Sequence, residues 1–233
     1  MGDVYKRQVE ALRRDAFALE PLTTRGDVEA GDAADAYRAC AQCWLAANGA
    51  GPARAERDAA ATAWLPALVA ALAAPLGAVS PFGGAAREPA PAALLRGAEL
   101  AYLYYAGGGY YRAHLDTPEG GGGPPAGGAP RHRRAFSFLL FLTPAGFDAA
   151  RDEGALRLYA PISPAEQRRR AATEHGAVGE GTLLDGSAAR DIAPEPGTLV
   201  VFRSEAVPHE ALPTRAPRHV LVGWLHRPLV GPT

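Results

Sequence analysis

From residue 99 onward, apolar and polar positions alternate in short runs, which is the pattern of half-buried β-strands. The strands predicted from this alternation cover residues 100–105, 134–143, 154–160, 189–193, 198–202, 210–212 and 219–226. No helical pattern of comparable length separates these strands. Many short strands in succession favour a sandwich or barrel over a parallel α/β sheet.

The first part of the chain has a helical pattern instead. Apolar residues recur at helical spacing from Asp32 to Asn48, and a second helix is expected from Ala53 to Ala73. The stretch 75–91 is rich in proline and glycine and is typical of a linker. We therefore predict a helical N-terminal extension with its linker over residues 1–91, followed by the main domain over residues 92–230.

Composition and charge narrow the class of protein. Of the 233 residues, 48% are hydrophobic and 21% are charged, as in a globular protein. A net charge of -1 gives no reason to expect nucleic acid or an anionic membrane as a partner. The first fifteen residues lack the apolar segment of a secretory signal, and the longest apolar run, 64–79, is too short to span a bilayer. A cytoplasmic location is expected, or a nuclear one in a eukaryotic cell.

The two cysteines form a C-x-x-C motif at Cys40 and Cys43. A redox dithiol would follow a strand in a βαβ unit, and a zinc site would need two further ligands nearby. Neither context is present in the sequence. On the expected helix the two side chains share one face, which predicts packed free thiols.

A candidate metal site begins with His114 and Asp116. Residues two apart in an extended chain point to the same side, so both side chains can reach one ion. Alone the pair is a weak signal, because a strand-capping histidine and a solvated aspartate would look the same. His209, at the start of a later strand, supplies a third ligand. Two imidazoles and one carboxylate form the facial triad that suits non-haem Fe(II), and ligands on separated strands facing one cavity favour a double-stranded β-helix (jelly roll).

An arginine on an apolar strand face suggests an anionic ligand. Arg218, Val220, Val222 and Trp224 alternate along the last predicted strand and share a face. A buried guanidinium without a partner is costly, and a carboxylate bound in bidentate fashion would satisfy it. Arg215 is the competing candidate, but it lies in the turn before the strand.

Together these segments resemble, in order and spacing, the prolyl 4-hydroxylase branch of the Fe(II)/2-oxoglutarate dioxygenases, including the hypoxia-sensing prolyl hydroxylases. The likeness covers residues 98–227. It implies that residues 92–230 form the dioxygenase domain, with Fe(2+), 2-oxoglutarate and O2 as its cofactors and co-substrates and L-ascorbate as reductant. It also implies oxidative decarboxylation of 2-oxoglutarate to succinate and CO2, coupled to hydroxylation of a prolyl residue in a protein or peptide. Other members of the fold act on free amino acids or other small molecules, which stay as alternatives.

The resemblance also assigns roles to residues. His114, Asp116 and His209 match the catalytic iron ligands, and Arg218 matches the residue that binds the distal carboxylate of 2-oxoglutarate. Residues matching the walls of the co-substrate pocket are Tyr105, Leu156 and Trp224. Tyr104 stays an alternative to Tyr105 because the glycine turn that follows is short. Tyr111 matches an aromatic residue at the substrate entrance and fits core packing equally well.

One departure concerns the strand around residues 136–143. Some relatives carry a polar residue there that gives the distal carboxylate a second contact, whereas this chain has Leu139, Leu140 and Phe141. Either Ser137 or Thr143 provides this second contact to the distal carboxylate, or Arg218 and Tyr105 bind it alone. His219 and His226 point away from the Arg218 face and are expected to be surface or packing residues.

Two further functions compete with the dioxygenase. The first is a non-catalytic jelly-roll module that binds a metal. The second is a zinc hydrolase with Glu210 as general base, although a residue next to His209 on a strand points away from the metal. The glycine- and proline-rich loop 117–130 is either a lid or an insertion, and the sequence indicates no oligomeric state.

Overall fold

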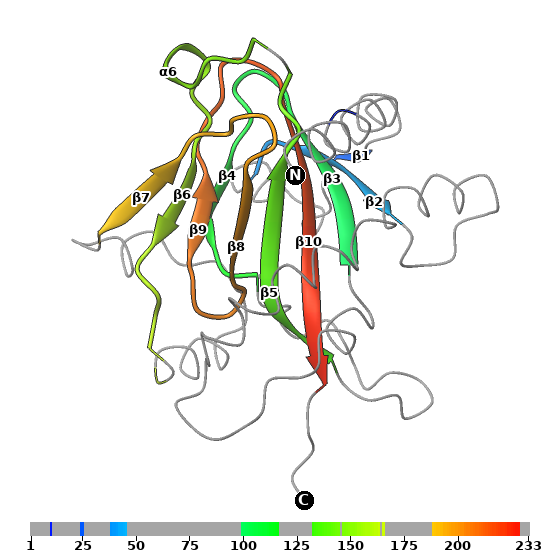
Figure 1. Ribbon diagram of the computed structural model, residues 1–233, viewed down its shortest axis with the longest axis vertical. Helices are drawn as coiled ribbons and strands as arrows, with labels where there is room; N and C mark the ends of the chain where they lie inside the picture. Colours follow the sequence, from blue (N-terminus) through cyan, green and yellow to red (C-terminus); the bar gives the residue numbers. More distant parts are fainter. Residues whose placement is uncertain are drawn as a thin grey trace, which may run out of the picture.

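The computed structural model describes residues 10, 24–25, 38–45, 99–116, 132–144, 146–163, 165 and 188–228. These residues form two antiparallel sheets (Figure 1). The six-stranded sheet has the order β1 (Thr24–Arg25), β2 (Ala41–Leu45), β3 (Glu99–Tyr105), β10 (Arg218–Pro228), β5 (His132–Phe141), β8 (Leu199–Arg203). The four-stranded sheet has the order β4 (Tyr111–His114), β9 (His209–Ala211), β6 (Leu156–Tyr159), β7 (Ala189–Ile192). This mainly β architecture is consistent with the predicted double-stranded β-helix.

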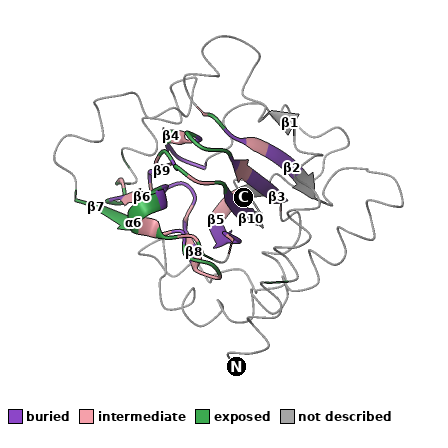
Figure 2. Cartoon of the chain, turned by 90° about the horizontal axis from the view of Figure 1, so that it is seen from above, coloured by how far each residue is buried: buried purple, intermediate pink, exposed green. Residues whose placement is uncertain are grey.

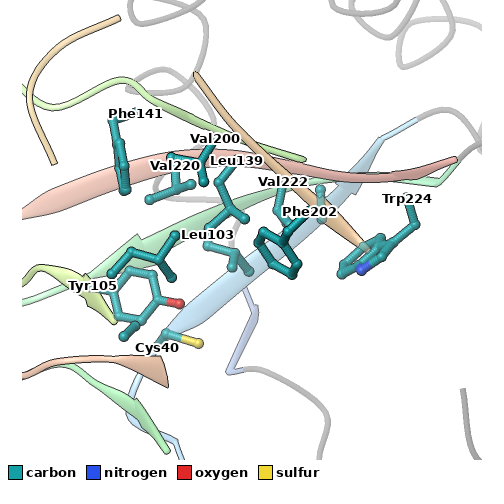
Figure 3. Packing of buried hydrophobic residues seen from close by; sticks show 13 residues of the cluster. Cys40, Leu103, Tyr105, Leu139, Phe141, Val200, Phe202, Val220, Val222 and Trp224 are labelled. Atoms are coloured by element: carbon teal, nitrogen blue, oxygen red, sulfur yellow. The ribbon is translucent and has the colours of Figure 1, made fainter. Parts of the chain in front are cut away.

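The two sheets enclose an apolar core. Side chains from β3, β5, β8 and β10 pack together in this core (Figure 3). Leu156 and Ala211 of the smaller sheet belong to the same cluster. Burial is concentrated in the larger sheet, whereas β7 and the helix α6 (Ala149–Asp152) are largely exposed (Figure 2). The members of the core cluster are Cys40, Ala101, Leu103, Tyr105, Leu139, Phe141, Leu156, Val200, Phe202, Ala211, Val220, Val222 and Trp224.

The central strand β10 is buried on both faces. Val220 and Val222 face the core cluster, while Leu221 and Leu225 on the opposite face have no exposed surface. This explains the nearly continuous apolar run in the sequence. Gly223 lies opposite Phe138 of β5, and a Cβ at that glycine would come within 2.3 Å of the Phe138 ring. The close approach of the two strands therefore requires glycine at this position.

The predicted helix from Asp32 to Asn48 is wrong over residues 38–45. These residues contain strand β2, which pairs antiparallel with β3 from Ala41 opposite Tyr104 to Leu45 opposite Leu100. Helical propensity of an alanine-rich stretch is a weak preference, and the ladder with β3 overrides it. The expected helix 53–73 and linker 75–91 lie outside the described residues.

The division at residue 91 stays a prediction, although β2, which precedes it, belongs to the same sheet as β3. All seven strands predicted from the alternation are present, with ends shifted by at most two residues, and β4 is a further strand that was not predicted. The four-residue helix α6 was not predicted; the carboxylate of Asp148 caps it by accepting from the backbone N–H groups of Ala150 and Arg151.

In the described part of the chain no helix is long and apolar enough to cross a membrane. The loop 117–130 lies outside the described residues.

Residues 38–45 connect with both sheets. Ala39 and Tyr110 exchange two backbone hydrogen bonds, and Arg38 forms a β-bridge with Tyr111 at the start of β4. From Ala41 onward the same segment pairs with β3 in the other sheet. The segment therefore holds the two sheets together at the edge where β3 ends and β4 begins.

Candidate metal centre

Three side chains with metal-binding atoms meet between β4 and β9. His114, the last residue of β4, lies directly opposite His209, the first residue of β9. Asp116 follows two positions after His114. Its carboxylate oxygens lie 3.5 Å from Nε2 of His114 and 3.6 Å from Nε2 of His209. One ligand atom from each residue lies within 4.8 Å of the other two, so a single ion can contact all three.

Backbone carbonyl groups orient both imidazoles. Nδ1 of His114 lies 2.8 Å from the carbonyl oxygen of Arg112, and Nδ1 of His209 lies 3.2 Å from that of Val207. Since a carbonyl oxygen only accepts, each Nδ1 carries the proton. The lone pair of each ring is then on Nε2, the atom that faces Asp116, as in a metal-binding histidine.

The charges of the site also suit a cation. Burial by itself would raise the pKa of Asp116, but the neighbouring imidazoles of His209 and His114 outweigh it and lower the pKa well below its ordinary value. Burial, reinforced by His114, lowers the pKa of His209 to about 4. At neutral pH the site therefore combines an ionised carboxylate with a neutral imidazole at His209.

The burial and hydrogen bonding of these three side chains fit a divalent metal ion. All three side chains are buried, and Oδ2 of Asp116 has no hydrogen-bond partner in the described structure. A buried carboxylate oxygen without a partner is costly unless a cation or water satisfies it. Two imidazoles and one carboxylate are the ligands of the facial triad, and the residues present therefore fit Fe(II).

Aromatic rings pack on both imidazoles. The half-buried ring of Tyr111 stacks on His114 with 3.8 Å between centroids, and Phe202 of β8 lies 4.5 Å from His209. Burial raises the pKa of Tyr111 to about 12, so it stays a neutral phenol. Tyr111 thus contacts the metal centre and also packs against the core, so both predictions made for it are compatible with its position.

A buried pair of serines lies beside the metal centre and was not predicted. The hydroxyls of Ser137 and Ser204 are 2.9 Å apart and neither residue has exposed surface. Ser137 lies near enough to Asp116 to contribute to the lowering of its pKa. The other candidate substitute, Thr143, donates to the carbonyl oxygen of Pro194. The only signal for Ser137 in the sequence is a hydroxyl within a long apolar strand.

Arg218 lies at the start of β10 with only 1% of its surface exposed. Its Nη1 donates to the carbonyl oxygen of Gly154, and its guanidinium lies 4.0 Å above the ring of Tyr105, the residue opposite it in the ladder. Nε has no hydrogen-bond partner, and no carboxylate of the described residues forms an ion pair with Arg218. Burial lowers its pKa. A buried cation in this state fits an anionic ligand.

Tyr104 and Tyr105, the two alternatives for the pocket residue, lie on opposite faces of β3. Tyr105 lies on the core face under Arg218, whereas Tyr104 lies on the opposite face beside the ring of His219. Leu156 and Trp224 are buried members of the same core cluster as Tyr105.

Arg215 is exposed and forms an ion pair of 2.7 Å with Glu153, so it does not compete with Arg218 for a buried ligand.

The other charged candidates lie away from the metal centre. His219 and His226 are both buried and are therefore packing rather than surface residues; His226 pairs with Glu99 at 3.1 Å. Glu210 accepts a hydrogen bond from the hydroxyl of Tyr159 and lies 3.7 Å from Arg157. Its carboxylate is engaged on the opposite side of β9 from His209, which argues against a general base next to the metal.

Comparison with protein families gives one match, the family described as the 2OG-Fe(II) oxygenase superfamily, over residues 100–226. A comparison with curated proteins finds no significant match.

Solved structures with similar folds include a prolyl-4-hydroxylase from Pseudomonas putida, with a TM-score of 0.58 and 23% sequence identity over 95% of this chain and 87% of that one. They also include a prolyl hydroxylase from Trichoplax adhaerens, in complex with a peptide fragment of the hypoxia inducible factor oxygen degradation domain. That match has a TM-score of 0.59 and 17% identity over 97% of this chain and 79% of the other. At these identities the likeness establishes the fold.

Proposed function

The chain belongs to the 2OG-Fe(II) oxygenase superfamily, whose family model covers more than half of it, and from this premise we propose that it hydroxylates a prolyl residue of a protein or peptide. Membership makes it a 2-oxoglutarate-dependent dioxygenase. The observation that carries the proposal is the convergence of His114, Asp116 and His209 in the same jelly roll as the buried Arg218. Among the described residues, no carboxylate forms an ion pair with Arg218.

In this proposal His114, Asp116 and His209 hold the iron. Their backbone-anchored rings and ionised carboxylate are oriented before the metal arrives, which lowers the cost of forming the site. When bound, Fe(II) supplies, with O2, the oxidative decarboxylation of 2-oxoglutarate to succinate and CO2 and the insertion of the second oxygen atom into a substrate C–H bond. L-ascorbate would serve as the reductant that keeps the iron ferrous.

The role proposed for Arg218 is to bind the distal carboxylate of 2-oxoglutarate. Its Nε is available for this contact, while the bond to Gly154 and the ring of Tyr105 fix the orientation of the guanidinium. Leu156 and Trp224 form apolar walls that exclude water. In a dry pocket the ion pair between guanidinium and carboxylate is stronger than at the surface.

Two observations support a prolyl substrate. Both similar structures named above are prolyl hydroxylases, and one of them holds a peptide. Tyr111 stacks on His114 and is only partly buried, so in this proposal a substrate side chain reaches the metal centre beside it. A free amino acid or another small molecule is the alternative substrate of the same reaction.

The test is mass spectrometry of proline-containing peptides and of free proline after incubation with Fe(II), 2-oxoglutarate, ascorbate and O2. We expect a peptide to gain one oxygen atom with matching formation of succinate. The variants His114→Ala and His209→Ala should lose about a hundredfold or more of this activity. His219→Gln, a buried histidine on the other face of β10, is the matched control.

Turnover that persists in both ligand variants would refute the iron site. Hydroxylation of free proline without any peptide product would favour the small-molecule alternative. A metal-loaded protein that shows no saturable binding of 2-oxoglutarate would favour the non-catalytic module.

A further inference from the structure

Residue Cys40 lies where the segment 38–45 passes from one sheet to the other. Ala39 is bonded to Tyr110 beside β4, and Ala41 is already paired with Tyr104 of β3. Cys40 thus stands between these two attachments, next in register to Tyr105. The same edge of the molecule holds Arg218, which is opposite Tyr105 on the neighbouring strand.

The side chain of Cys40 belongs to the core cluster, and its exposed fraction is 9%. Figure 3 shows its sulfur close to the hydroxyl end of Tyr105. Cys43 differs: it lies opposite Tyr102, and it is not a member of the core cluster. Because the segment is extended, residues three apart point to opposite faces of the sheet, and only Cys40 faces the core.

Two guanidinium groups and one phenol hydroxyl lie near the thiol of Cys40. Burial raises the pKa of its thiol, and the nearby guanidinium groups of Arg38 and Arg218 and the hydroxyl of Tyr105 oppose that effect. The thiol is therefore neutral at pH 7 and cannot neutralise Arg218. The guanidinium of Arg218 lies near enough to the thiol to affect its pKa. Its Nε has no hydrogen-bond partner among the described residues. The thiol of Cys40 is small, neutral and polarizable, so an anion can bind to the guanidinium of Arg218 beside it.

We propose that Cys40 forms a wall of the co-substrate pocket, where its thiol contacts the distal end of 2-oxoglutarate and keeps the hydroxyl of Tyr105 in place. The proposal rests on the proposed function, since it uses Arg218 as the carboxylate-binding residue. It assigns a part of the pocket to the N-terminal segment, which lies before the family match. Cys43, on the opposite face, has no such role.

Kinetics of three variants test this assignment. Cys40→Ala removes the sulfur and should raise the KM for 2-oxoglutarate about 3- to 10-fold with kcat nearly unchanged, which is the signature of lost ground-state contact. Cys40→Ser keeps a small polar group and should stay within about twofold of the wild type. Cys43→Ala, the matched control from the same motif and strand, should leave this KM unchanged.

Alkylation gives a measurement that does not depend on turnover. The manganese(II)-loaded protein is treated with N-ethylmaleimide, and the modification of each cysteine is followed by mass spectrometry with and without 2-oxoglutarate. Binding should slow the labelling of Cys40 several-fold and leave that of Cys43 unchanged. The protection should disappear in Arg218→Ala.

Equal protection of both cysteines, or none at Cys40, would overturn the proposal, provided calorimetry shows that 2-oxoglutarate binds to the wild type. If calorimetry shows no binding to the metal-loaded wild type, the proposed function fails with it. The same holds in the kinetics, where an unchanged KM in Cys40→Ala removes the role of Cys40 while leaving the dioxygenase intact.

Discussion

At the scale of single residues, the guanidinium of Arg218 is the group whose surroundings say most about a ligand. It is buried, stacked on Tyr105 and bonded to one carbonyl oxygen, yet within the described part of the chain its Nε has no hydrogen-bond partner. Charged groups are rarely buried in this state unless a ligand completes them. The carboxylate of Asp116, in the metal centre, is likewise a buried charged group, and its Oδ2 has no hydrogen-bond partner in the described structure.

The substitution Arg218→Lys tests the geometry of this cation. Lysine keeps the charge but not the planar fork, so one of two charge-assisted hydrogen bonds is lost. We expect the KM for 2-oxoglutarate to rise about 10- to 100-fold, since such a bond contributes about 1.5–3 kcal/mol. Steady-state kinetics and calorimetric titration measure the change. Arg215→Lys, at the exposed arginine paired with Glu153, is the control; an unchanged KM in Arg218→Lys would contradict the assigned role.

At the scale of elements, strand β10 determines where the site lies. It pairs with β3 on one side and with β5 on the other, and its first residue is Arg218. A shift of register by one residue would turn Arg218 away from the core, so the ladder must be strongly specified. The fit between Gly223 and Phe138 contributes to this specificity, because only one register places the glycine against that ring.

The variant Gly223→Ala tests this fit. Its methyl group would collide with the buried Phe138 ring and with Leu100, and we expect a loss of about 1–3 kcal/mol in the free energy of unfolding. Urea denaturation measures it. In the double variant with Phe138→Leu the two losses should be less than additive, because the smaller side chain leaves space for the methyl group. Additive losses would show that the strain lies elsewhere.

At the scale of the whole molecule, the metal centre joins distant parts of the chain. Asp116 and His209 are separated by 93 positions in the sequence and meet only when β4 pairs with β9. The unfolded chain cannot hold these ligands together. Metal binding therefore stabilises the folded state as a whole.

Removal and return of the metal test this linkage. Protein treated with a chelator should melt at a lower temperature than protein with Fe(II) or Mn(II) in excess, since a ligand at a hundred times its Kd contributes about 2.7 kcal/mol. Differential scanning calorimetry measures the two melting temperatures. His209→Ala should abolish the metal-dependent difference, and His219→Gln should keep it. A difference that survives in His209→Ala would place the metal elsewhere.

The sequence determined the features that depend on local pattern. Alternation of apolar residues predicted seven of the eight strands described after residue 91, all except β4. The two-residue spacing predicted that His114 and Asp116 point the same way. The order of the motifs along the chain indicated the family, whose match covers residues 100–226. These features could be predicted because strand periodicity and motif spacing are properties of the linear sequence and do not depend on contacts between distant segments.

Only the tertiary structure decided the features that depend on contacts between distant segments. Residues 41–45 form a strand because they pair with β3 in a ladder, although they lie in the alanine-rich stretch 32–48, whose pattern favours a helix. Cys40 and Cys43 therefore lie on opposite faces and not on one. The register between β3 and β10 places Tyr105, and not Tyr104, under the guanidinium of Arg218. Local propensity amounts to a few tenths of a kcal/mol per residue, and burial and pairing with partners far along the chain outweigh it.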